Sequence, residues 1–264
     1  LPYILNTSIP FFMRKGYFTK TKKNVKLNTA GVNSESAAYR SYLVKNGYPL
    51  VISGLSIALY TRAGQIILGN LESISTVGYY NAALTIAGGW SFLPIICMTS
   101  LLPMVLRDRC NKDTGFSFIY LIALLVSIPL IVLCKIFDSE IIYYTYGEAF
   151  MPSVEVFSVL AVSTLFSVFG VIGVRVIIAN NGNNFLMKKM GVMVILNLVL
   201  TYVLLSEYGM IGAAYAILIT EIISSTVANY FFKGAYVLRI QLSIPTSIVY
   251  LRCLINDLTK KERK

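Results

Sequence analysis

The chain has no histidine among its 264 residues. Histidine is the commonest general base near neutral pH and a frequent metal ligand, so its absence argues against many hydrolases and metal centres. Cysteine is also scarce, and no pair of cysteines has the spacing of a metal or redox motif. We interpret the four as small buried hydrophobic residues and expect no cofactor; they are Cys97, Cys110, Cys134 and Cys253.

Charged residues make up only 13% of the chain, whereas hydrophobic residues make up 56%. A typical soluble domain carries about 25% charged residues. The composition therefore predicts an integral membrane protein. No G-x-x-x-x-G-K-[ST] loop is present, so we do not expect ATP to bind through such a loop.

The formal net charge of +11 suggests a nucleic-acid partner at first sight. The basic residues, however, are divided among separate connections and do not gather in one segment. A nucleic-acid-binding protein concentrates them on one face. We therefore predict no nucleic-acid partner, and expect membrane lipids to be the surroundings of the chain.

Six stretches approach the ~20 apolar residues that a helix needs to cross a bilayer. They predict an all-α fold, a six-helix transmembrane bundle. We expect the second stretch to be one long helix, kinked where Gly88, Gly89 and Pro94 lie. The stretches are residues 49–70, 77–106, 116–137, 154–179, 190–206 and 210–232.

The basic residues follow the order of the predicted helices. Twenty of the 23 Lys and Arg lie before the first helix, after the sixth, or in every second connection. We assign Lys188 and Lys189 to one of these basic connections. Basic connections stay in the cytoplasm, so we predict a multi-pass membrane protein with both ends of this chain cytoplasmic.

The remaining segments are short and more polar. We expect residues 1–13 to be the end of a preceding transmembrane helix and residues 14–48 to be a basic cytoplasmic linker between two lobes. Within the linker, residues 34–45 favour a short surface helix that ends at Gly47. Residues 49–232 form the six-helix lobe. Residues 233–264 form a basic tail in the cytoplasm or at the membrane interface.

Two charged residues, Arg62 and Glu221, fall well inside predicted membrane helices. A charge at the bilayer centre costs roughly 3 kcal/mol on insertion scales, so such residues usually face a bundle interior or a wet cavity. For Arg62, a cavity role competes with snorkelling or with a structural pair to Glu221. For Glu221, proton coupling or substrate contact competes with the same structural pair.

Other polar residues in the predicted helices have more ordinary explanations. Arg175 lies about one turn from the end of its helix, where its side chain can snorkel to the headgroups. The side chains of Gln65 and Asn81 are expected to hydrogen-bond between helices. Gly170 and Gly173 offer a small surface on which another helix packs closely. Arg62, Gln65, Glu221, Arg175 and Asn81 are our candidates for substrate contact or coupling.

Several motifs resemble one transporter family. They are the run G-Y-P-L-V-I-S-G-L-S-I-A-L-Y-T-R-A-G-Q-I-I-L-G from Gly47, V-G-Y-Y-N-A-A at 77–83, W-S-F-L-P at 90–94 and Y-G-M-I-G-A-A at 208–214. Their order and spacing resemble the C-terminal half of Wzx-type O-antigen flippases, within the multidrug/oligosaccharidyl-lipid/polysaccharide exporter superfamily. Arg62 and Gln65 match the family pattern, but Gly64 stands where the family has Asp.

The resemblance implies a two-lobed transporter of about twelve helices, of which this chain is the second lobe. Its substrate would be an undecaprenyl-diphosphate-linked oligosaccharide, moved across the inner membrane for lipopolysaccharide or similar surface polysaccharide. Coupling would use H⁺, Na⁺ or the substrate gradient, and other polysaccharide-assembly proteins would be partners. A multidrug/cation antiporter of the same superfamily and an inactive truncated flippase or scaffold remain alternatives. A membrane enzyme is disfavoured because the outer connections are short and lack His.

Overall fold

The computed structural model describes residues 29–107, 111–247 and 250. Its contacts divide the chain into two units, Leu1–Gly47 and Tyr48–Lys264. The described part of the first unit is helical backbone that belongs to α2 (Thr29–Leu71). The predictions for residues 1–13, for the linker up to residue 28 and for the second half of the tail concern residues that the structure does not describe. All further description concerns the second unit.

Helix α2 corrects one prediction about the linker. We expected a short helix to end at Gly47 and a new one to begin at Pro49, but α2 runs through both residues. Glycine in a helix costs only about 1 kcal/mol relative to alanine, which neighbouring turns can offset. Ser53 Oγ donates a hydrogen bond to the carbonyl oxygen of Pro49 at 2.6 Å, within the same helix.

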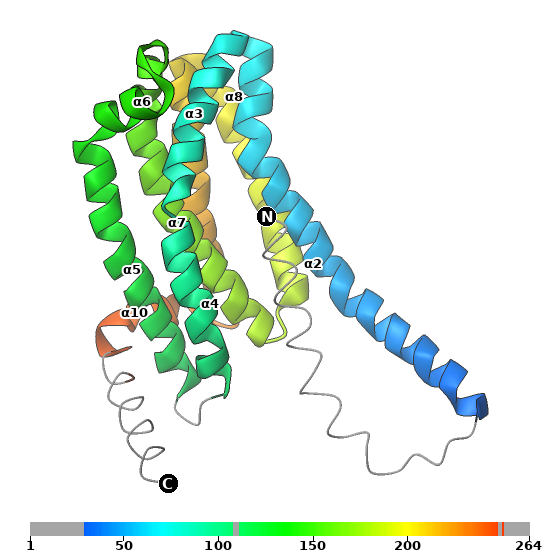
Figure 1. Ribbon diagram of the computed structural model, residues 1–264. Coiled ribbons are helices and arrows are strands. Elements are labelled where there is room, and N and C mark those ends of the chain that lie inside the picture. The colour runs from blue at the N-terminus through cyan, green and yellow to red at the C-terminus, as the bar shows by residue number, and fades with distance from the viewer. Residues whose placement is uncertain (1–28, 108–110, 248–249, 251–264) are drawn as a thin grey trace. The chain divides into compact units, whose positions relative to one another are not determined.

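The second predicted span is indeed interrupted where a kink was expected. It consists of α3 (Ile74–Gly89) and α4 (Phe92–Arg107), with a turn at Trp90 and Ser91. The side chain of Ser73 caps the start of α3 by accepting a hydrogen bond from the Thr76 N–H. In Figure 1, α4 continues away from α3 toward the opposite end of the bundle.

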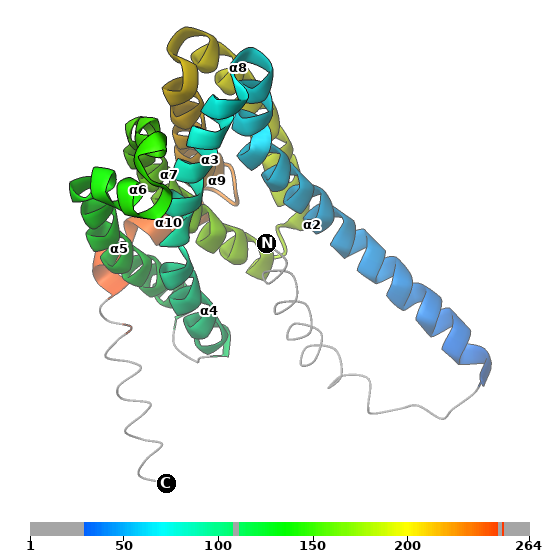
Figure 2. The same cartoon turned by 45° about the horizontal axis from the view of Figure 1, so that its top comes forward.

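The third and fourth predicted spans correspond to single helices. They are α5 (Lys112–Ile136) and α7 (Val154–Ala179), and the second of these has the predicted bounds. Between them lie α6 (Asp138–Tyr146) and the 3₁₀ segment η1 (Glu148–Ser153). Helix α7 lies at the centre, because it contacts α3, α5 and α8 (Figures 1 and 2).

The fifth and sixth predicted spans are two legs of one element, α8 (Asn183–Ile222). Gly209 has φ 59° and ψ −142°, a backbone conformation that only glycine adopts readily, and it reverses the chain. Asn197 and Thr220 are 23 positions apart, yet their side chains are hydrogen-bonded at 3.0 Å. In a straight helix they would be separated by about 35 Å. The two legs therefore form a tight hairpin.

The last predicted span ends irregularly. After α8 the chain forms a π-helical turn, η2 (Ile223–Val227), and then the short α9 (Ala228–Tyr230). Helix α10 (Tyr236–Leu242) and the 3₁₀ turn η3 (Ile244–Ser247) follow, with α10 crossing beside α5 at one end of the bundle (Figure 1). Single π-turns inside α-helices are often found at functional sites.

The described residues contain five stretches that are long and apolar enough to cross a membrane. The fifth contains both legs of the α8 hairpin and its continuation, so the six predicted apolar stretches are present as helices of an all-α bundle. The stretches are Gly47–Leu71, Ile74–Leu106, Lys112–Ile136, Glu148–Ala179 and Asn183–Tyr230.

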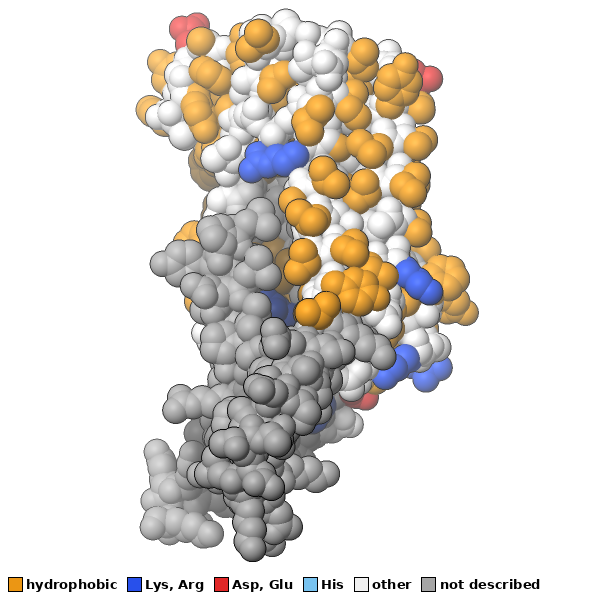
Figure 3. Space-filling view, turned by 90° about the vertical axis from the view of Figure 1, so that its right-hand side faces the viewer, with side chains coloured by type: hydrophobic (Ala, Val, Ile, Leu, Met, Phe, Trp, Pro, Cys, Tyr) orange, Lys and Arg blue, Asp and Glu red, His pale blue; other side chains and the backbone are white. Residues whose placement is uncertain are grey.

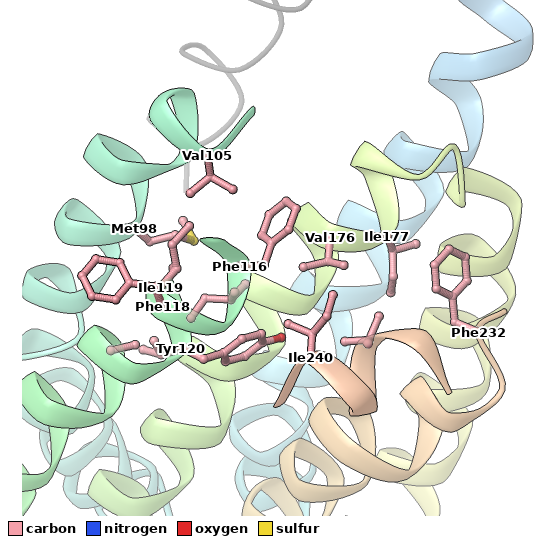
Figure 4. Close-up of a cluster of buried hydrophobic side chains, with 14 of the residues drawn as sticks. Met98, Val105, Phe116, Phe118, Ile119, Tyr120, Val176, Ile177, Phe232 and Ile240 are labelled. Carbon is pink, nitrogen blue, oxygen red and sulfur yellow. The ribbon is translucent and has the colours of Figure 1, made fainter. Parts of the chain in front are cut away.

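Two hydrophobic clusters hold the bundle together. One is centred on α5 and includes Phe116, Tyr120 and Val176, and Figure 4 shows these side chains converging between the helices. The other includes Leu68, Tyr80 and Leu160, which come from α2, α3 and α7. Because lipid is as apolar as these side chains, close packing is a larger source of stability here than removal from water.

Candidate functional site

Glu221 lies inside the bundle, on the second leg of α8, and is only 5% exposed. Its carboxylate oxygen Oε1 accepts a hydrogen bond from the hydroxyl group of Tyr60 on α2, at 3.2 Å. The side chain of Ser167 on α7 also hydrogen-bonds this carboxylate. A buried ionisable group needs such partners, because an unpaired charge in an apolar interior is very costly. Side chains of three helices therefore meet at Glu221.

The glycines of α7 make room for this polar interior. A Cβ atom added to Gly170 would lie 3.8 Å from Oε2 of Glu221. One added to Gly173 would lie 3.2 Å from Nδ2 of Asn229 and 3.3 Å from the hydroxyl group of Tyr120. The two glycines were predicted to allow close packing of helices. In the structure they let polar side chains lie directly against α7.

Lys189 is the second ionisable residue inside the bundle, also 5% exposed. Its Nζ donates a hydrogen bond of 2.7 Å to Oδ1 of Asn229, whose Nδ2 in turn donates to the carbonyl oxygen of Ser225 at 2.7 Å. Lys189 also interacts electrostatically with Glu221. Among the described residues, the buried charged side chains are thus one acidic and one basic, on opposite legs of the α8 hairpin.

The polar contacts continue from Ser225 toward α10. Nε2 of Gln241 donates to the carbonyl oxygen of Ser225 at 2.9 Å and to the hydroxyl group of Tyr120 at 3.3 Å. Tyr120 then donates to the carbonyl oxygen of Phe169 at 3.3 Å. The π-helical turn is therefore where the polar interior meets α10. We call the set of Tyr60, Ser167, Lys189, Glu221, Ser225, Asn229, Gln241 and Tyr120 the buried polar network.

Asn197 and Thr201 add a further polar contact within the α8 hairpin. Nδ2 of Asn197 donates to Thr220 Oγ1, while its Oδ1 accepts from Thr201 Oγ1 at 3.4 Å. All three side chains are fully buried. Hydrogen bonds between membrane helices contribute on the order of 1 kcal/mol each, so we interpret this group as structural.

Arg62 lies on the opposite face of α2 from Tyr60, because residues two positions apart in an α-helix are rotated by about 200° around its axis. It is exposed, and its Nη1 donates to Oε1 of Gln65 at 3.1 Å. The structural pair between Arg62 and Glu221 that the sequence left open is therefore not formed. The bond to Arg62 uses the oxygen of the Gln65 amide, while Nε2 of that amide is buried without a partner within the described residues.

The other two candidates lie elsewhere. Arg175 is half-buried near the end of α7, close to Ala179. Asn81 is half-buried on α3, and its backbone carbonyl oxygen accepts a hydrogen bond from Thr85 Oγ1 at 2.8 Å. Of the five candidates, the structure places Glu221 in the buried polar network, Arg62 and Gln65 together on α2, and Arg175 and Asn81 at separate positions.

Lys189 was not among the predicted site residues, because we assigned it to a basic connection between two helices. Helix α8 begins at Asn183, so Lys188 and Lys189 both lie in its first two turns. The buried face of this leg follows the helical period, and Lys189 falls on it whereas Lys188 is exposed. That helical period is the sequence signal that could have identified Lys189 as a buried residue. The buried positions are Leu186, Lys189, Met190, Met193, Asn197, Thr201 and Leu205.

The surface around these helices is mainly apolar. Figure 3 shows hydrophobic side chains over much of one face, with a few Lys and Arg side chains among them. A cleft of ≈ 190 Å³ opens between the first leg of α8 and the segment formed by η2 and α9, and Lys189 is the one ionisable residue of its lining. The lining residues are Phe185, Lys189, Val192, Met193, Ile223, Val227, Ala228 and Phe231.

Comparison with known proteins identifies the fold of the chain. No protein-family model and no curated protein sequence matches the chain. Among solved structures, it is similar to a multidrug resistance MATE family transporter of the MOP superfamily in an outward-facing conformation. The TM-score is 0.58 and the identity 21%, over 79% of this chain and 52% of that one.

Two further solved structures give the same result. One is MATE in a straight conformation, with a TM-score of 0.59 and 21% identity over 79% of this chain and 52% of that chain. The other is a MOP superfamily transporter from Pyrococcus furiosus described as having a binding pocket of reverse polarity, with a TM-score of 0.58 and 20% identity over 78% and 52%. The chain spans about half the length of these structures, and it has the multi-pass helical fold of that portion of a MATE transporter.

Proposed function

We propose that this chain forms one six-helix half of a secondary transporter that moves its substrate by alternating access. The observation that carries the proposal is the buried polar network around Glu221, set inside helices whose fold is shared with half of a MATE transporter. An intramembrane ionisable residue is by default a candidate for a transport pathway or a proton relay. The activity is proposed for the whole protein, because the chain spans only about half the length of the structures it resembles.

Multidrug antiport coupled to H⁺ or Na⁺ is one candidate activity. It is favoured by the structural neighbours, one of which is described as a multidrug resistance transporter. Glu221 would then be a coupling group, since a carboxyl group in a dry interior can take up and release a proton as its surroundings change.

Flipping of a lipid-linked oligosaccharide is the second candidate, and a different observation favours it. Arg62 is an exposed cation inside an apolar membrane helix, whereas Glu221 is buried. An exposed guanidinium group attracts a diphosphate and repels a cationic drug, since Arg presents several donors that match phosphate oxygens. The motifs that resemble Wzx-type flippases point to the same anionic substrate.

One paired experiment separates the two activities. The full-length protein is expressed in a flippase-deficient strain and in a strain that lacks its drug exporters. Restored surface polysaccharide supports flipping, and restored resistance to cationic drugs supports antiport. Neither phenotype, with normal amounts of the protein in the membrane, would contradict the proposed transport function.

A further inference from the structure

The two buried ionisable residues of the α8 hairpin are not independent. Lys189 and Glu221 are each 5% exposed, and both are held against one face of α7. Oε2 of Glu221 lies against Gly170, and Asn229, which accepts the hydrogen bond from Lys189, lies against Gly173 one turn further along. Among the described residues, one side-chain ion pair is closer than 4 Å, and it is the surface pair Lys135–Asp138. The ammonium group of Lys189 and the carboxylate of Glu221 are therefore more than 4 Å apart. Each is instead fixed by neutral partners: Asn229 accepts from Lys189, and Tyr60 donates to Glu221.

Among the described residues, Lys189 and Glu221 are the buried charged side chains, and Arg175 near the end of α7 is half-buried. The neighbours of Glu221 are the hydroxyl groups of Tyr60 on α2 and Ser167 on α7, with Lys189 as the nearby cation. Lys189 is in turn fixed by Asn229, and the other residues that line its cleft are uncharged. In such surroundings, either charge without the other would be left uncompensated, which is strongly destabilising.

We propose that Lys189 is the internal counter-ion of Glu221, and that the two side chains form one site that takes up a single proton and excludes Na⁺. The carboxylate and the ammonium group together carry no net charge, so the pair is tolerated in the closed, dry arrangement. When a proton from water binds the Glu221 carboxylate, a neutral acid and an ammonium ion remain. The site then has a net charge of +1 and must be hydrated.

This change of charge links proton uptake to opening of the bundle. No covalent bond other than the new O–H bond forms or breaks, and the proton returns to water when the carboxylate is restored. Tyr60 continues to hydrogen-bond the carboxyl group, which keeps α2 in contact with α8 during the step. The uptake part of the inference rests on the proposed transport function, whereas the pairing of the two residues does not.

Sodium is excluded by the same arrangement. Hard cations are held by several oxygen ligands, usually including carboxylates. Glu221 is the one carboxylate of the buried polar network, and the part of the chain that the structure describes contains no group of three or more His, Cys, Asp or Glu side chains that suits a metal ion. The nearby ammonium group of Lys189 repels a second cation. A proton needs only one oxygen atom.

The pairing is tested by the thermal stability of the full-length protein in detergent between pH 5 and pH 9. Each single variant is compared with the double variant Lys189→Met/Glu221→Gln, which contains neither charge. In Lys189→Met, the carboxylate has no counter-ion, so the loss in Tm relative to the double variant is largest at high pH and shrinks at low pH, where the carboxyl group is neutral. In Glu221→Gln, the ammonium group is left alone, so the loss in Tm relative to the double variant is largest at low pH and shrinks at high pH. We expect each loss to reach roughly 6 °C or more at its unfavourable end.

The controls use the same helix. The double variant Lys189→Met/Glu221→Gln contains neither charge, so the Tm of the wild type should fall relative to it only at the low pH at which the Glu221 carboxyl group is protonated. Lys188→Met removes an exposed charge at the neighbouring position and should change nothing. Losses that do not depend on pH in both single variants, or the same pH dependence in both, would overturn the pairing. If a single variant does not fold, failure of the double variant to restore folding would overturn it too.

The ion is tested separately. Replacing Na⁺ by choline at constant ionic strength should leave the wild-type Tm unchanged, and stabilisation by Na⁺ that Glu221→Gln abolishes would refute the exclusion of Na⁺. In proteoliposomes, a pH gradient should drive transport by the wild type but not by Glu221→Gln. If the Tm values of the two single variants depend on pH in opposite ways but the wild type transports nothing, the pairing is upheld and the proposed transport function is contradicted. Equal pH-driven transport by both proteins would refute proton uptake alone.

Discussion

The turn of the α8 hairpin gives the most direct test of the fold. We predict that Gly212→Ala destabilises the protein, because the new Cβ atom would lie 2.0 Å from the carbonyl oxygen of Leu204 and 3.0 Å from the backbone nitrogen of Leu205. These are backbone atoms of the opposite leg, so no side-chain rotation removes the overlap. The two legs must move apart near the turn.

The expected magnitude follows from three contributions. Overpacking of this kind costs about 1–3 kcal/mol. Separation of the legs also weakens the hydrogen bond between Asn197 and Thr220, which contributes about 1 kcal/mol. Alanine in a helix is favoured over glycine by about 1 kcal/mol, which offsets part of the loss. The net loss is about 1–3 kcal/mol, or a Tm lower by roughly 2–12 °C for a protein of this size.

The chain offers a matched control on the same helix. A Cβ atom added to Gly191 meets nothing within 4 Å, so Gly191→Ala should gain about 1 kcal/mol from helix propensity alone. Both variants are measured by thermal unfolding in detergent, followed by size-exclusion chromatography of the soluble fraction. If Gly212→Ala is as stable as Gly191→Ala, then the legs do not approach as closely as described, and the hairpin geometry is wrong.

Three further predictions concern named polar contacts. Tyr60→Phe removes the hydrogen bond to the buried carboxylate of Glu221 and should lower stability by about 1–3 kcal/mol, which thermal unfolding at pH 7 measures; an unchanged Tm would contradict the contact. Arg62→Ala in the full-length protein should abolish complementation of a flippase-deficient strain while Arg62→Lys keeps part of it, and full complementation by the Ala variant at normal expression would exclude Arg62 from substrate contact. Burial, together with the hydrogen bond to Asp113 and the negative charge of that residue, raises the pKa of Tyr236 to about 12. Since the unfolded chain loses this proton near pH 10, the contribution of Tyr236 is complete below pH 10 and is lost as the pH rises toward 12, so Tyr236→Phe should lose less Tm than the wild type above pH 10; parallel losses would refute this.

The positions of the membrane helices could be predicted from the sequence, because bilayer thickness fixes the length of an apolar stretch. Helix α7 has the predicted bounds, Val154–Ala179, and the interruption at Trp90 and Ser91 lies beside the glycines that indicated it. The start of α8 was placed too late, since its first turns are polar and hydropathy alone does not detect them. The helix that continues through Gly47 was missed for a related reason: a glycine marks an end only where the chain leaves the helical conformation.

The candidate site could be predicted only in part. Glu221 was found because a charge in an apolar stretch is visible in the sequence itself. Its partners were not found, because nothing in the sequence distinguishes Tyr60 from other tyrosines on the apolar face of a helix. Tyr60 also lies 161 positions from Glu221 in the chain. Lys189 was read as a loop residue, although the helical period of the buried face identifies it. Which side chains meet across a bundle depends on helix rotation, and a single sequence does not determine that rotation.

The reversal at Gly209 has a consequence for biosynthesis. Only a short apex joins the two legs of α8, because Gly209 alone departs from helical backbone between them, and the exposed side chains of Ser206 and Glu207 lie next to it. So short a connection keeps the two legs side by side from the moment both have been made. The insertion machinery has to accept both as a single preformed hairpin, and any tag or epitope spliced into that apex would separate them before they enter.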